Sequence, residues 1–426
     1  MTDGDTDGKT ELDAETLLAK LRDGEVRLHG LERHTDHTTA ERVRRKYVAG
    51  ETGAGLSAVA EHGFAAAAVD SNVENLVGAV EVPMGVAGPV PVDGGATEGE
   101  RYLPLATTEG ALVASVNRGL AAIRAAGGAS ARVVASGMTR APVFRVSGVV
   151  EATETVEWVR THGETLREAA EATTDHGELL DVDPYVVGDS VYLRFVYDTK
   201  DAMGMNMATI ATEAACAVVE RETAADLVAL SGNLCTDKKP AAINAVEGRG
   251  RTVVADVSLP ADLVRDRLDT EPAAMREANT RKNLVGSAKA GSLGFNAQAA
   301  NVVAAAFLAT GQDGAQVVEG ANAITTVDVR EEPDADATGE ATANERLYAS
   351  VSLASLEVGT VGGGTSLPTQ RAALEVVGAA GGGSPPGSNA EALAETIAVG
   401  ALGGELSLLA ALSSRHLAEA HERLGR

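Results

Sequence analysis

Two adjacent lysines, Lys238 and Lys239, stand in the segment TDKKPAAIN at residues 236–244. The chain has eight lysines against 28 arginines, so this pair between an acid and a proline is unusual. Pro240 cannot continue a helix, which predicts that the lysines lie on a loop. Two compact ammonium groups side by side repel each other unless Asp237 or an anionic ligand neutralises them. The pair therefore favours binding of a carboxylate or stabilisation of an oxyanion over two solvated surface lysines.

Four other segments contain residues suited to chemistry, but each is only a weak indication of function when taken alone. Glu109 follows two threonines at the expected start of a helix, where a carboxylate either complements the helix dipole or acts as a general acid. The segment DAMGMNM pairs a capping Asp201 with small and flexible residues whose N–H groups could approach a phosphate, although methionines also fill cores. GTVGGGT at 359–365 could cradle a pyrophosphate, but it is not a GxGxxG fingerprint. Asp313 follows an apolar helix and is expected to be half-buried.

The chain around these segments is predicted to contain both helices and strands. Residues 11–75 are predicted as helical pieces, after about ten residues expected to be disordered. Helices are predicted over 109–126, 153–176, 201–224 and most of 260–311, strands over 143–151, 191–197 and 252–258, and a last helix up to the C-terminus. The acidic tract at 334–345 is expected to be a solvated loop. The alternation of strand and helix between 141 and 229 predicts a small α+β unit.

The composition bounds the partners and the environment. Acids outnumber bases 61 to 36, and the formal net charge of −25 argues against nucleic acid or an anionic membrane surface as a partner. An ordinary acidic cytosolic protein would fit this balance. Scarce lysine and 3% aromatic residues instead favour a protein adapted to a salty cytosol, where a Debye length of about 3 Å at 1 M salt screens the repulsion.

The size of the chain and its cysteines indicate a soluble protein of a reducing compartment. With 426 residues, 44% of them hydrophobic, the chain can form two or three domains. Cys216 and Cys235 cannot alone make a disulfide framework or a zinc site. The N-terminus lacks the pattern of a signal peptide, and no apolar run reaches the length of about 18 residues of a membrane span. We therefore expect a cytoplasmic location.

Several segments, taken in chain order, match the motifs of one enzyme family. They are ENLVGAVEVPMGVAGPV, ATTEGALVASVNRG, DAMGMNM, SGNLCTDKKPAAINAVEGRG, KNLVGSAKAGS, GQDGAQ, EVGTVGGGT and ELSLLAAL. The set resembles 3-hydroxy-3-methylglutaryl-CoA (HMG-CoA) reductase, in the class I form of eukaryotes and archaea. The resemblance covers residues 75–424, and the composition is similar to that of a soluble, halophilic archaeal member.

This resemblance implies a role for each matching residue. Lys238 would stabilise charge on the thioester oxygen, Glu109 would donate a proton, and Asp313 would lie beside Glu109 and tune it. The fourth catalytic residue implied is His421, which would protonate the departing CoA thiolate. The residues implied to bind the substrate are Arg140, Ser231, Asp237, Lys239, Lys282 and Asn301. Those implied to bind CoA are Ser115, Asn117, Arg118 and Ser407. Those implied to bind the cofactor are Thr174, Asp201, Met203, Gly204, Met205, Asn206, Met207, Gly362 and Gly363.

The fold and the reaction are likewise implied by the resemblance. It implies an α+β fold with a helical region at 1–75 and a large domain built around a long central helix at 76–140 and 230–426. A small ferredoxin-like NADP-binding domain would occupy 141–229. The enzyme would reduce (S)-HMG-CoA to mevalonate and CoA with two NADPH and no metal, supplying isoprenoid and ether-lipid synthesis. It would be a dimer or a dimer of dimers, in which the lysine loop of one subunit meets Glu109 and Asp313 of its neighbour.

Two departures and two alternatives belong beside this interpretation. Thr174, Asp175 and His176 stand where family members often carry a Ser-Arg-Phe run near the cofactor's 2′-phosphate, and an acid there weakens the expectation of NADPH preference. Gln298 replaces a histidine of eukaryotic members but can still form hydrogen bonds. A CoA-thioester acyltransferase with Cys235 as nucleophile is one alternative, although no histidine is near it in sequence. A non-catalytic acidic binding protein is the other.

Overall fold

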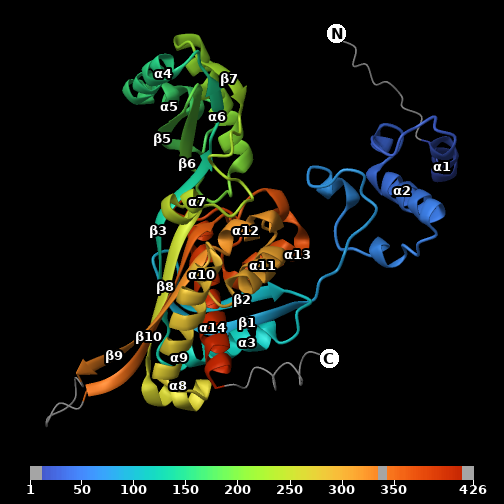
Figure 1. Cartoon of the computed structure of the whole chain (residues 1–426). Coiled ribbons are helices and arrows are strands. Elements are labelled where there is room, and N and C mark those ends of the chain that lie inside the picture. Colours follow the sequence, from blue (N-terminus) through green and yellow to red (C-terminus); the bar gives the residue numbers. More distant parts are fainter. Residues whose placement is uncertain (1–11, 334–342, 415–426) are drawn as a thin grey trace.

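A sheet of ten strands runs through the body of the protein in the computed structural model, which describes residues 12–333 and 343–414 (Figure 1). The strands are β1 (Met84–Gly94), β2 (Glu98–Ala106), β3 (Ala129–Arg140), β4 (Val143–Arg145), β5 (Glu178–Val187), β6 (Ser190–Asp198), β7 (Asp226–Ala229), β8 (Gly250–Pro260), β9 (Ala323–Pro333) and β10 (Ala343–Leu356). Their order is β7-β4-β6-β3-β8-β10-β9, with β1 beside β2 and β3, and β5 beside β6. The pairs of strands are antiparallel except for β1 with β3.

One strand, β3, belongs to both halves of this sheet. Its residues from Ser130 to Gly137 pair with β8, whereas Met138 to Arg140 pair with β6. The strand therefore leads from the main body into the part of the molecule drawn at the top of Figure 1. We call that part, made of β4 to β7 and three helices described below, the small lobe.

The helices lie on the faces of the sheet and in a separate N-terminal unit. They are α1 (Ala14–Arg22), α2 (His37–Thr52), α3 (Leu112–Ala125), α4 (Val149–Thr161), α5 (Gly163–Glu171), α6 (Met205–Glu222), α7 (Ala242–Glu247), α8 (Ala261–Leu268), α9 (Pro272–Ala278), the π-helix η4 (Asn279–Gly286), α10 (Ser287–Ala290), α11 (Ala299–Thr310), α12 (Val317–Gly320), α13 (Pro368–Val377) and α14 (Ser388–Ser413). Short 3-10 turns are η1 (Leu31–Arg33), η2 (Ala58–Ala60), η3 (Ala66–Val69), η5 (Gly314–Gln316) and η6 (Gly363–Ser366).

The hydrophobic core falls into separate clusters. The largest joins β1, β2, β8 and β10 with α3, α11 and α14. A second cluster fills the small lobe, where α4, α5 and α6 pack on β5 and β6. A third lies between α1 and α2 in the N-terminal unit, which stands apart in Figure 1. In each cluster the apolar faces of the local helices pack together, so each part of the molecule has a core of its own.

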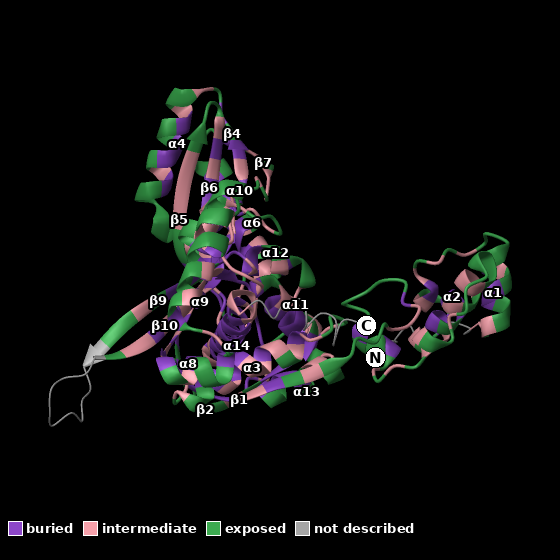
Figure 2. Cartoon of the chain, turned by 60° about the horizontal axis from the view of Figure 1, so that its bottom comes forward, coloured by how far each residue is buried: buried purple, intermediate pink, exposed green. Residues whose placement is uncertain are grey.

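Helix α14 is 26 residues long and lies in the middle of the largest cluster, where Figure 2 shows it as buried. Among the described helices it alone has the length and hydropathy of a membrane span, but 78% of its apolar window is buried inside the protein. It crosses α3 in backbone contact, because a Cβ added at Gly119 would meet the oxygen of Gly403 at 1.8 Å. Burial in the core thus accounts for its apolar sequence.

The predicted elements are confirmed in part. The strands at 191–197 and 252–258 and the helix at 201–224 correspond to β6, β8 and α6. The prediction of a strand up to residue 151 was wrong, because the chain turns into α4 at Val149. The single helix at 153–176 is two helices that meet at His162 and end at Glu171. The C-terminal part of the last helix and most of the 334–345 tract lie outside the described residues.

Candidate active site

The lysine segment lies on a loop whose backbone is strained. Among its residues Asn233, Thr236 and Lys238 have φ values of 63°, 47° and 60°, in the left-handed region that residues with a side chain rarely adopt. Each such residue costs about 1–3 kcal/mol, and the conformation persists only where surrounding contacts impose it. The prediction of a loop is therefore confirmed, and the contacts of this loop become the question.

The ammonium group of Lys238 contacts an acid at the end of α11. Its Nζ lies 2.9 Å from Asp313 Oδ2, and this hydrogen bond raises the pKa of Lys238. Asp313 is fixed in turn, because its Oδ1 caps η5 by accepting from the N–H of Ala315. Both side chains are partly exposed, at 45% and 32%. Lys238 is thus held as a partly exposed cation, within reach of a ligand.

Within one chain Asp313 has a partner that the resemblance did not imply. The resemblance implied that Asp313 lies beside Glu109 and faces the lysine loop of a neighbouring subunit. In the structure Asp313 binds Lys238 of its own chain, because the lysine loop lies against the end of α11. It is Glu109 that lies elsewhere.

A buried network of charges lies behind the lysine loop. Arg249, fully buried, donates from Nη1 to Glu319 at 3.0 Å and Glu357 at 3.1 Å, and from Nη2 to Asp237 at 3.0 Å. Burial alone would raise the pKa of Asp237, but the hydrogen bond from Gln316 and the charge of Arg249 lower it overall. The charge of Arg140 acts in the same direction, which places this expected ligand of the substrate near Asp237. Asp237 is therefore an anion held between cations.

Glu109 lies at the other end of α11. It sits in the bend before α3, which begins at Leu112 and thus three residues later than expected, after a left-handed Ala111. Its N–H donates to Thr107 Oγ1 at 3.0 Å. Its carboxylate accepts a hydrogen bond of 3.3 Å from Asn301 Nδ2, in the first turn of α11. The structure therefore brings together the expected proton donor and one expected ligand of the substrate.

Lys282 also belongs to this end of α11. It lies on the π-helix η4, a rare element that often marks functional sites. Burial raises the pKa of Glu405 overall, and the charge of nearby Lys282 offsets a small part of this rise. Glu405 accepts from the N–H groups of Ala297 and Gln298, just before α11 begins.

The predicted residues thus form two groups in one chain, one at each end of α11. We call Lys238, Asp237 and Asp313 the lysine half, and Glu109, Asn301 and Lys282 the glutamate half. Asn301 and Thr310 are nine residues apart on a helix with a rise of 1.5 Å per residue, which separates the two ends by about 14 Å. A single side chain cannot span that distance, so one chain alone does not bring Glu109 to Lys238.

The two segments expected at the cofactor lie side by side. Ala202 and Val361 form a parallel bridge, and the N–H of Thr360 donates to the backbone oxygen of Asp201. Gly362 and Gly363 have φ values of 75° and 54°, and a Cβ added at either would meet nothing within 4 Å. Open space and a left-handed backbone suit a close approach by a phosphate group. Met203, Met205 and Met207 pack against the core of the small lobe, and Gly204 and Asn206 stand between them.

Two predicted cofactor residues have specific contacts. The carboxylate of Asp201, 5% exposed, accepts four backbone N–H groups, from Gly383, Gly387, Asn389 and Ala390. It therefore caps α14, and the expectation that it caps the following helix was wrong, because Gly204 stands at the N-cap of α6. Thr174 lies near Met207, since a Cβ at Gly177 would touch both.

The residues expected to bind CoA lie on α3 and α14. Ser115 donates to Ser407 at 3.1 Å, across the contact of these helices. Asn117 accepts from the N–H of Gly88, and Arg118 donates to the backbone oxygen of Leu268. These four side chains hold the chain itself together in the free protein.

The remaining predicted residues have fewer bonds. Ser231 Oγ is 3.9 Å from Cys235 Sγ, and Lys239 Nζ donates to the backbone oxygen of Asp237. Cys235 is fully buried, which weakens the alternative that uses it as a nucleophile. His421 lies outside the described residues.

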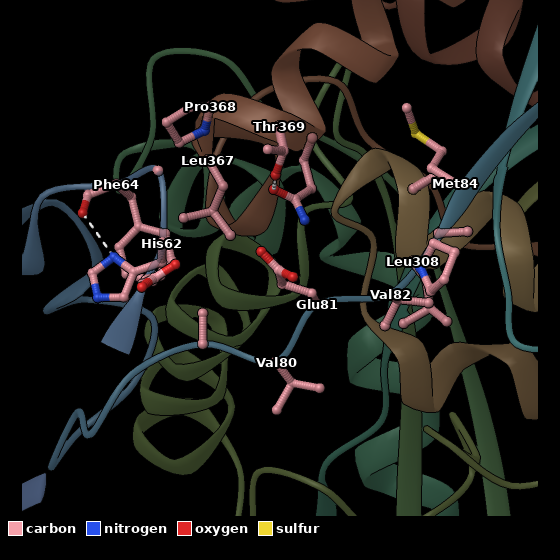
Figure 3. A pocket seen from close by; sticks show the side chains of 17 residues that line it. His62, Phe64, Val80, Glu81, Val82, Met84, Leu308, Leu367, Pro368 and Thr369 are labelled. Carbon is pink, nitrogen blue, oxygen red and sulfur yellow. Dashed lines mark hydrogen bonds between the residues drawn. The ribbon is translucent and has the colours of Figure 1, made fainter. Parts of the chain in front are cut away.

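A cavity of about 790 Å³ opens elsewhere, between residues 61–64, residues 79–84, and the ends of α11 and α13. Figure 3 shows Glu81, Val82 and Leu308 on its wall. No predicted site residue lines it. The clusters of charged side chains are the better candidate for an active site, because they carry groups suited to catalysis.

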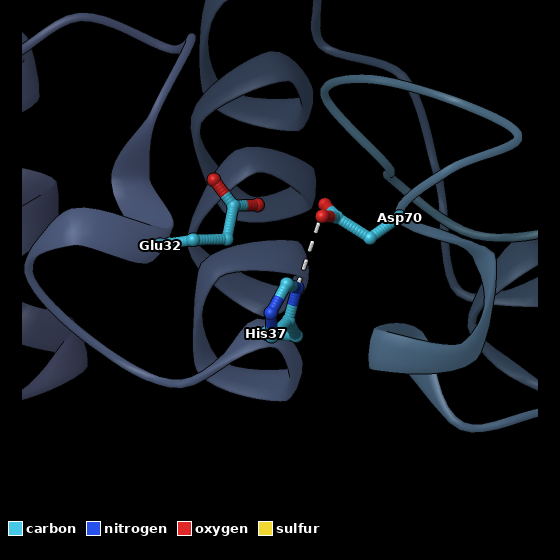
Figure 4. Close-up of side chains that lie close together, drawn as sticks. All are labelled: Glu32, His37 and Asp70. Carbon is cyan, nitrogen blue, oxygen red and sulfur yellow. Dashed lines mark ion pairs between the residues drawn. The ribbon is translucent and has the colours of Figure 1, made fainter. Parts of the chain in front are cut away.

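Glu32, His37 and Asp70 gather in the N-terminal unit, as Figure 4 shows, and lie within metal-ligand distance of one another. Both oxygens of Glu32 already accept from the buried Arg44, at 2.5 and 2.7 Å, and these bonds lower its pKa. A guanidinium on the same carboxylate opposes a bound cation. The cluster fits an ion pair that fastens η3 to α2 better than a metal site.

Sequence and fold comparisons agree on one family. The model of the family described as hydroxymethylglutaryl-coenzyme A reductase matches residues 40–426. The chain is 67% identical over 414 residues to the 3-hydroxy-3-methylglutaryl-coenzyme A reductase of Haloferax volcanii, covering 97% of this chain and 100% of that one. It is 65% identical over 415 residues to that of Halobacterium salinarum, covering 97% and 99%. The class II 3-hydroxy-3-methylglutaryl-CoA reductase from Streptococcus pneumoniae, bound to NADPH in open conformations, has a similar fold, with a TM-score of 0.63 at 20% identity over 95% of this chain and 99% of that one. The chain therefore belongs to the hydroxymethylglutaryl-coenzyme A reductase family.

Proposed function

We propose that the protein reduces (S)-HMG-CoA to mevalonate and CoA with two molecules of NADPH, and so supplies isoprenoid and ether-lipid synthesis. The observation that carries this proposal is the pair of half-sites at the two ends of α11, each with residues that the reaction needs. The identity of 67% to the reductase of Haloferax volcanii supports the substrate and the halophilic archaeal type. The class I form, which the sequence motifs imply, is part of the proposal.

We propose that the complete site forms between two subunits. The lysine half of one subunit would meet the glutamate half of the other, because the two halves lie about 14 Å apart along α11 within one chain. A homodimer, or a dimer of dimers, would supply two equal sites by symmetry. A monomer would then be inactive.

In this site each charged side chain has one task. Lys238 would neutralise the negative charge that develops on the thioester oxygen, and its compact ammonium suits a single oxygen better than a guanidinium. Arg140 and Lys239, beside Asp237, would hold the carboxylate of the substrate, with Ser231 and the Lys282 and Asn301 side chains of the neighbour. Glu109 would supply the proton, and His421 would protonate the CoA thiolate as it leaves.

The cofactor would lie where the two glycine- and methionine-rich segments meet. The uncovered backbone at Gly362 and Gly363 and the N-terminus of α6 at Met205 fit the phosphate groups of a dinucleotide. Bound NADPH supplies the hydride in each step. This chain would contribute binding, orientation and the charge of Lys238. No metal is part of the proposal.

The division of the chain into parts remains a proposal as well. It assigns residues 1–75 to a helical region, 76–140 and 230–426 to a domain for substrate and CoA, and 141–229 to a small ferredoxin-like domain for NADPH. The separate cores of the main body and the small lobe support it. The acidic composition supports a location in a salt-rich cytoplasm.

Initial rates with HMG-CoA and each nicotinamide cofactor test this function. We expect oxidation of NADPH to be faster than that of NADH, and activity to rise between about 0.1 and 2 M KCl as the Debye length falls from about 10 Å to under 3 Å. Asp175 makes the cofactor ratio informative, because an acid near the 2′-phosphate opposes NADPH. No consumption of either cofactor in molar KCl would reject the proposal.

A further inference from the structure

The backbone of Lys238 is fastened to a buried carboxylate that the reaction does not itself use. The N–H of Lys238 donates to Glu319 Oε1 at 2.5 Å, although the two residues are 81 positions apart. Glu319 lies on α12 and is fully buried. A bond between a charged acceptor and a backbone N–H is among the stronger hydrogen bonds in proteins. It acts on the residue whose φ of 60° is strained.

The same carboxylate holds both flanks of the lysine. Its Oε2 accepts from Asn244 Nδ2 at 2.7 Å, and that amide also donates to the backbone oxygen of Cys235 at 3.0 Å. Its Oε1 accepts from Arg249, which donates to the side chain of Asp237. Glu319 is thus the one described side chain that joins the loop before Lys238, the loop at Lys238 and the arginine that holds Asp237.

Glu319 forms part of a buried ion-pair network behind the lysine loop. Glu319 and Glu357 share the single cation Arg249, and all three are fully buried. Burial, followed by the nearby charge of Glu319, raises the pKa of Glu357 well above its ordinary value. Glu319, which forms the ion pair with Arg249 at 3.0 Å, also accepts from the N–H of Lys238 and from Asn244, so the charge of this ion pair acts directly on the loop. A neutral side chain at 319 would lose that charge and one acceptor.

We propose that Glu319 is a positioning residue for Lys238: it keeps the strained loop in the one conformation that directs the ammonium group to Asp313 and to the substrate. This inference rests on the proposed function, because it takes Lys238 as the group that acts on the substrate. Glu319 itself does not touch the substrate. Misplacing a catalytic group by about 1 Å can cost about 10²-fold in rate.

The first test compares Glu319→Gln and Glu319→Asp with the wild-type enzyme. Glutamine keeps one accepting oxygen and presents an N–H₂ group to the donors at the other position, whereas aspartate keeps the charge but is shorter. We expect kcat to fall by about 10–100-fold in Glu319→Gln and by less in Glu319→Asp, with KM for HMG-CoA within several-fold. A change in KM alone, with kcat kept, would overturn the proposal.

Glu395→Gln is the matched control. Glu395 is also buried, with 1% of its surface exposed. Its carboxylate accepts hydrogen bonds from the backbone N–H groups of Gly95, Ala96 and Thr97. These bonds hold the turn between β1 and β2, away from the lysine loop. We expect it to lower the melting temperature but to leave kcat unchanged. An equal loss of kcat in both variants would show that the effect is one of general stability.

A double-mutant cycle with Lys238→Ala separates positioning from other effects. If Glu319 acts through Lys238, then Glu319→Gln should lower kcat by less than about twofold in the Lys238→Ala background. Full additivity of the two losses would overturn the proposal. Should Glu319→Gln yield no folded protein, Glu319→Asp takes its place in the cycle.

Amide hydrogen exchange tests the positioning without any turnover. Peptides that cover residues 236–239 should exchange at least about tenfold faster in Glu319→Gln than in the wild type, and at the wild-type rate in Glu395→Gln. Unchanged exchange would contradict the proposal. An enzyme that fails to reduce HMG-CoA but shows this faster exchange would reject the proposed function alone.

Discussion

The two ends of α11 carry catalytic groups but hold them differently. At the C-terminal end, Lys238 is bound through its backbone to Glu319 and through its side chain to Asp313, and buried charges lie behind it. At the N-terminal end, Glu109 is exposed and its carboxylate accepts, among the described residues, only the 3.3 Å bond from Asn301. The lysine half is therefore formed in the free chain, whereas the glutamate half, if the proposed dimer forms, would gain its order when a partner covers it. The comparison predicts that mutations in the lysine half lower both stability and activity, whereas mutations in the glutamate half lower only activity.

Removal of the ammonium group has the largest expected effect. Lys238→Ala should lower kcat by about 10²–10³-fold while the affinity for HMG-CoA stays within several-fold, as for the loss of an oxyanion donor. Lys238→Arg should restore little, because a guanidinium is too large for the same place. Steady-state rates of the three proteins decide this. A rate in the arginine variant close to that of the wild type would make the role one of general anion binding.

Mixing two inactive variants tests how the halves combine. Glu109→Gln and Lys238→Ala homodimers should each be nearly inactive. After dissociation and reassembly, half of the dimers would be mixed, and each would hold one intact site, so about a quarter of wild-type activity should return. Subunits mixed without dissociation are the control. No recovery in reassembled dimers would place both halves of a site in the same subunit.

The stability of two single variants sharpens the contrast. Asp237→Asn weakens charge-assisted bonds from the buried Arg249 and from Gln316, and should cost about 1–3 kcal/mol. Glu109→Gln should change stability by less than about 0.5 kcal/mol, because it alters an exposed group with one weak bond. Melting temperatures in molar KCl measure both. Equal losses would show that the glutamate half is as firmly built as the lysine half.

The smallest effect concerns the pH dependence of stability. The pKa of Glu357 is raised, first by burial, above its ordinary 4.5. The folded protein then keeps a proton that the unfolded chain has released, so stability falls as the pH rises from 4.5 through the folded pKa. Glu357→Gln cannot ionise and should lose less stability across this window. Melting temperatures at about pH 5 and about pH 8 compare the two proteins, and parallel profiles would contradict the role of Glu357.

The sequence predicted the chemistry of the site better than its geometry. Lys238 stood out because lysine is rare in this chain, and the loop followed from Pro240. Its attachment to Glu319 had no local signal, because the partner lies 81 residues away in an apolar run. Arg249 lies in the segment EGRG, between Gly248 and Gly250, which both have a φ of 74°. No residue near it in the sequence indicated which acids it would pair with. Buried ion pairs between distant segments arise from the fold alone.

Two of the strands that the sequence failed to predict, β3 and β10, share a reason. β3 and β10 are rich in Ala and Ser, which have no strong preference for strands. By contrast β6, with its run of Val, Tyr, Leu and Phe, was predicted within one residue at each end. Small residues in β3 and β10 allow helices such as α14 to pack closely, so their contribution appears only in the tertiary structure.

The strand β3 also connects the main body with the small lobe. Gly137 is the last of its residues paired with the main body, and Met138 is the first paired with the small lobe. Arg140 lies two residues beyond this point, whereas Asp237 is fastened by Arg249 to the start of β8. A swing of the small lobe would therefore carry Arg140 toward or away from Asp237. If Arg140 holds the substrate carboxylate as proposed, the same movement of the small lobe would both release the spent cofactor and loosen this contact.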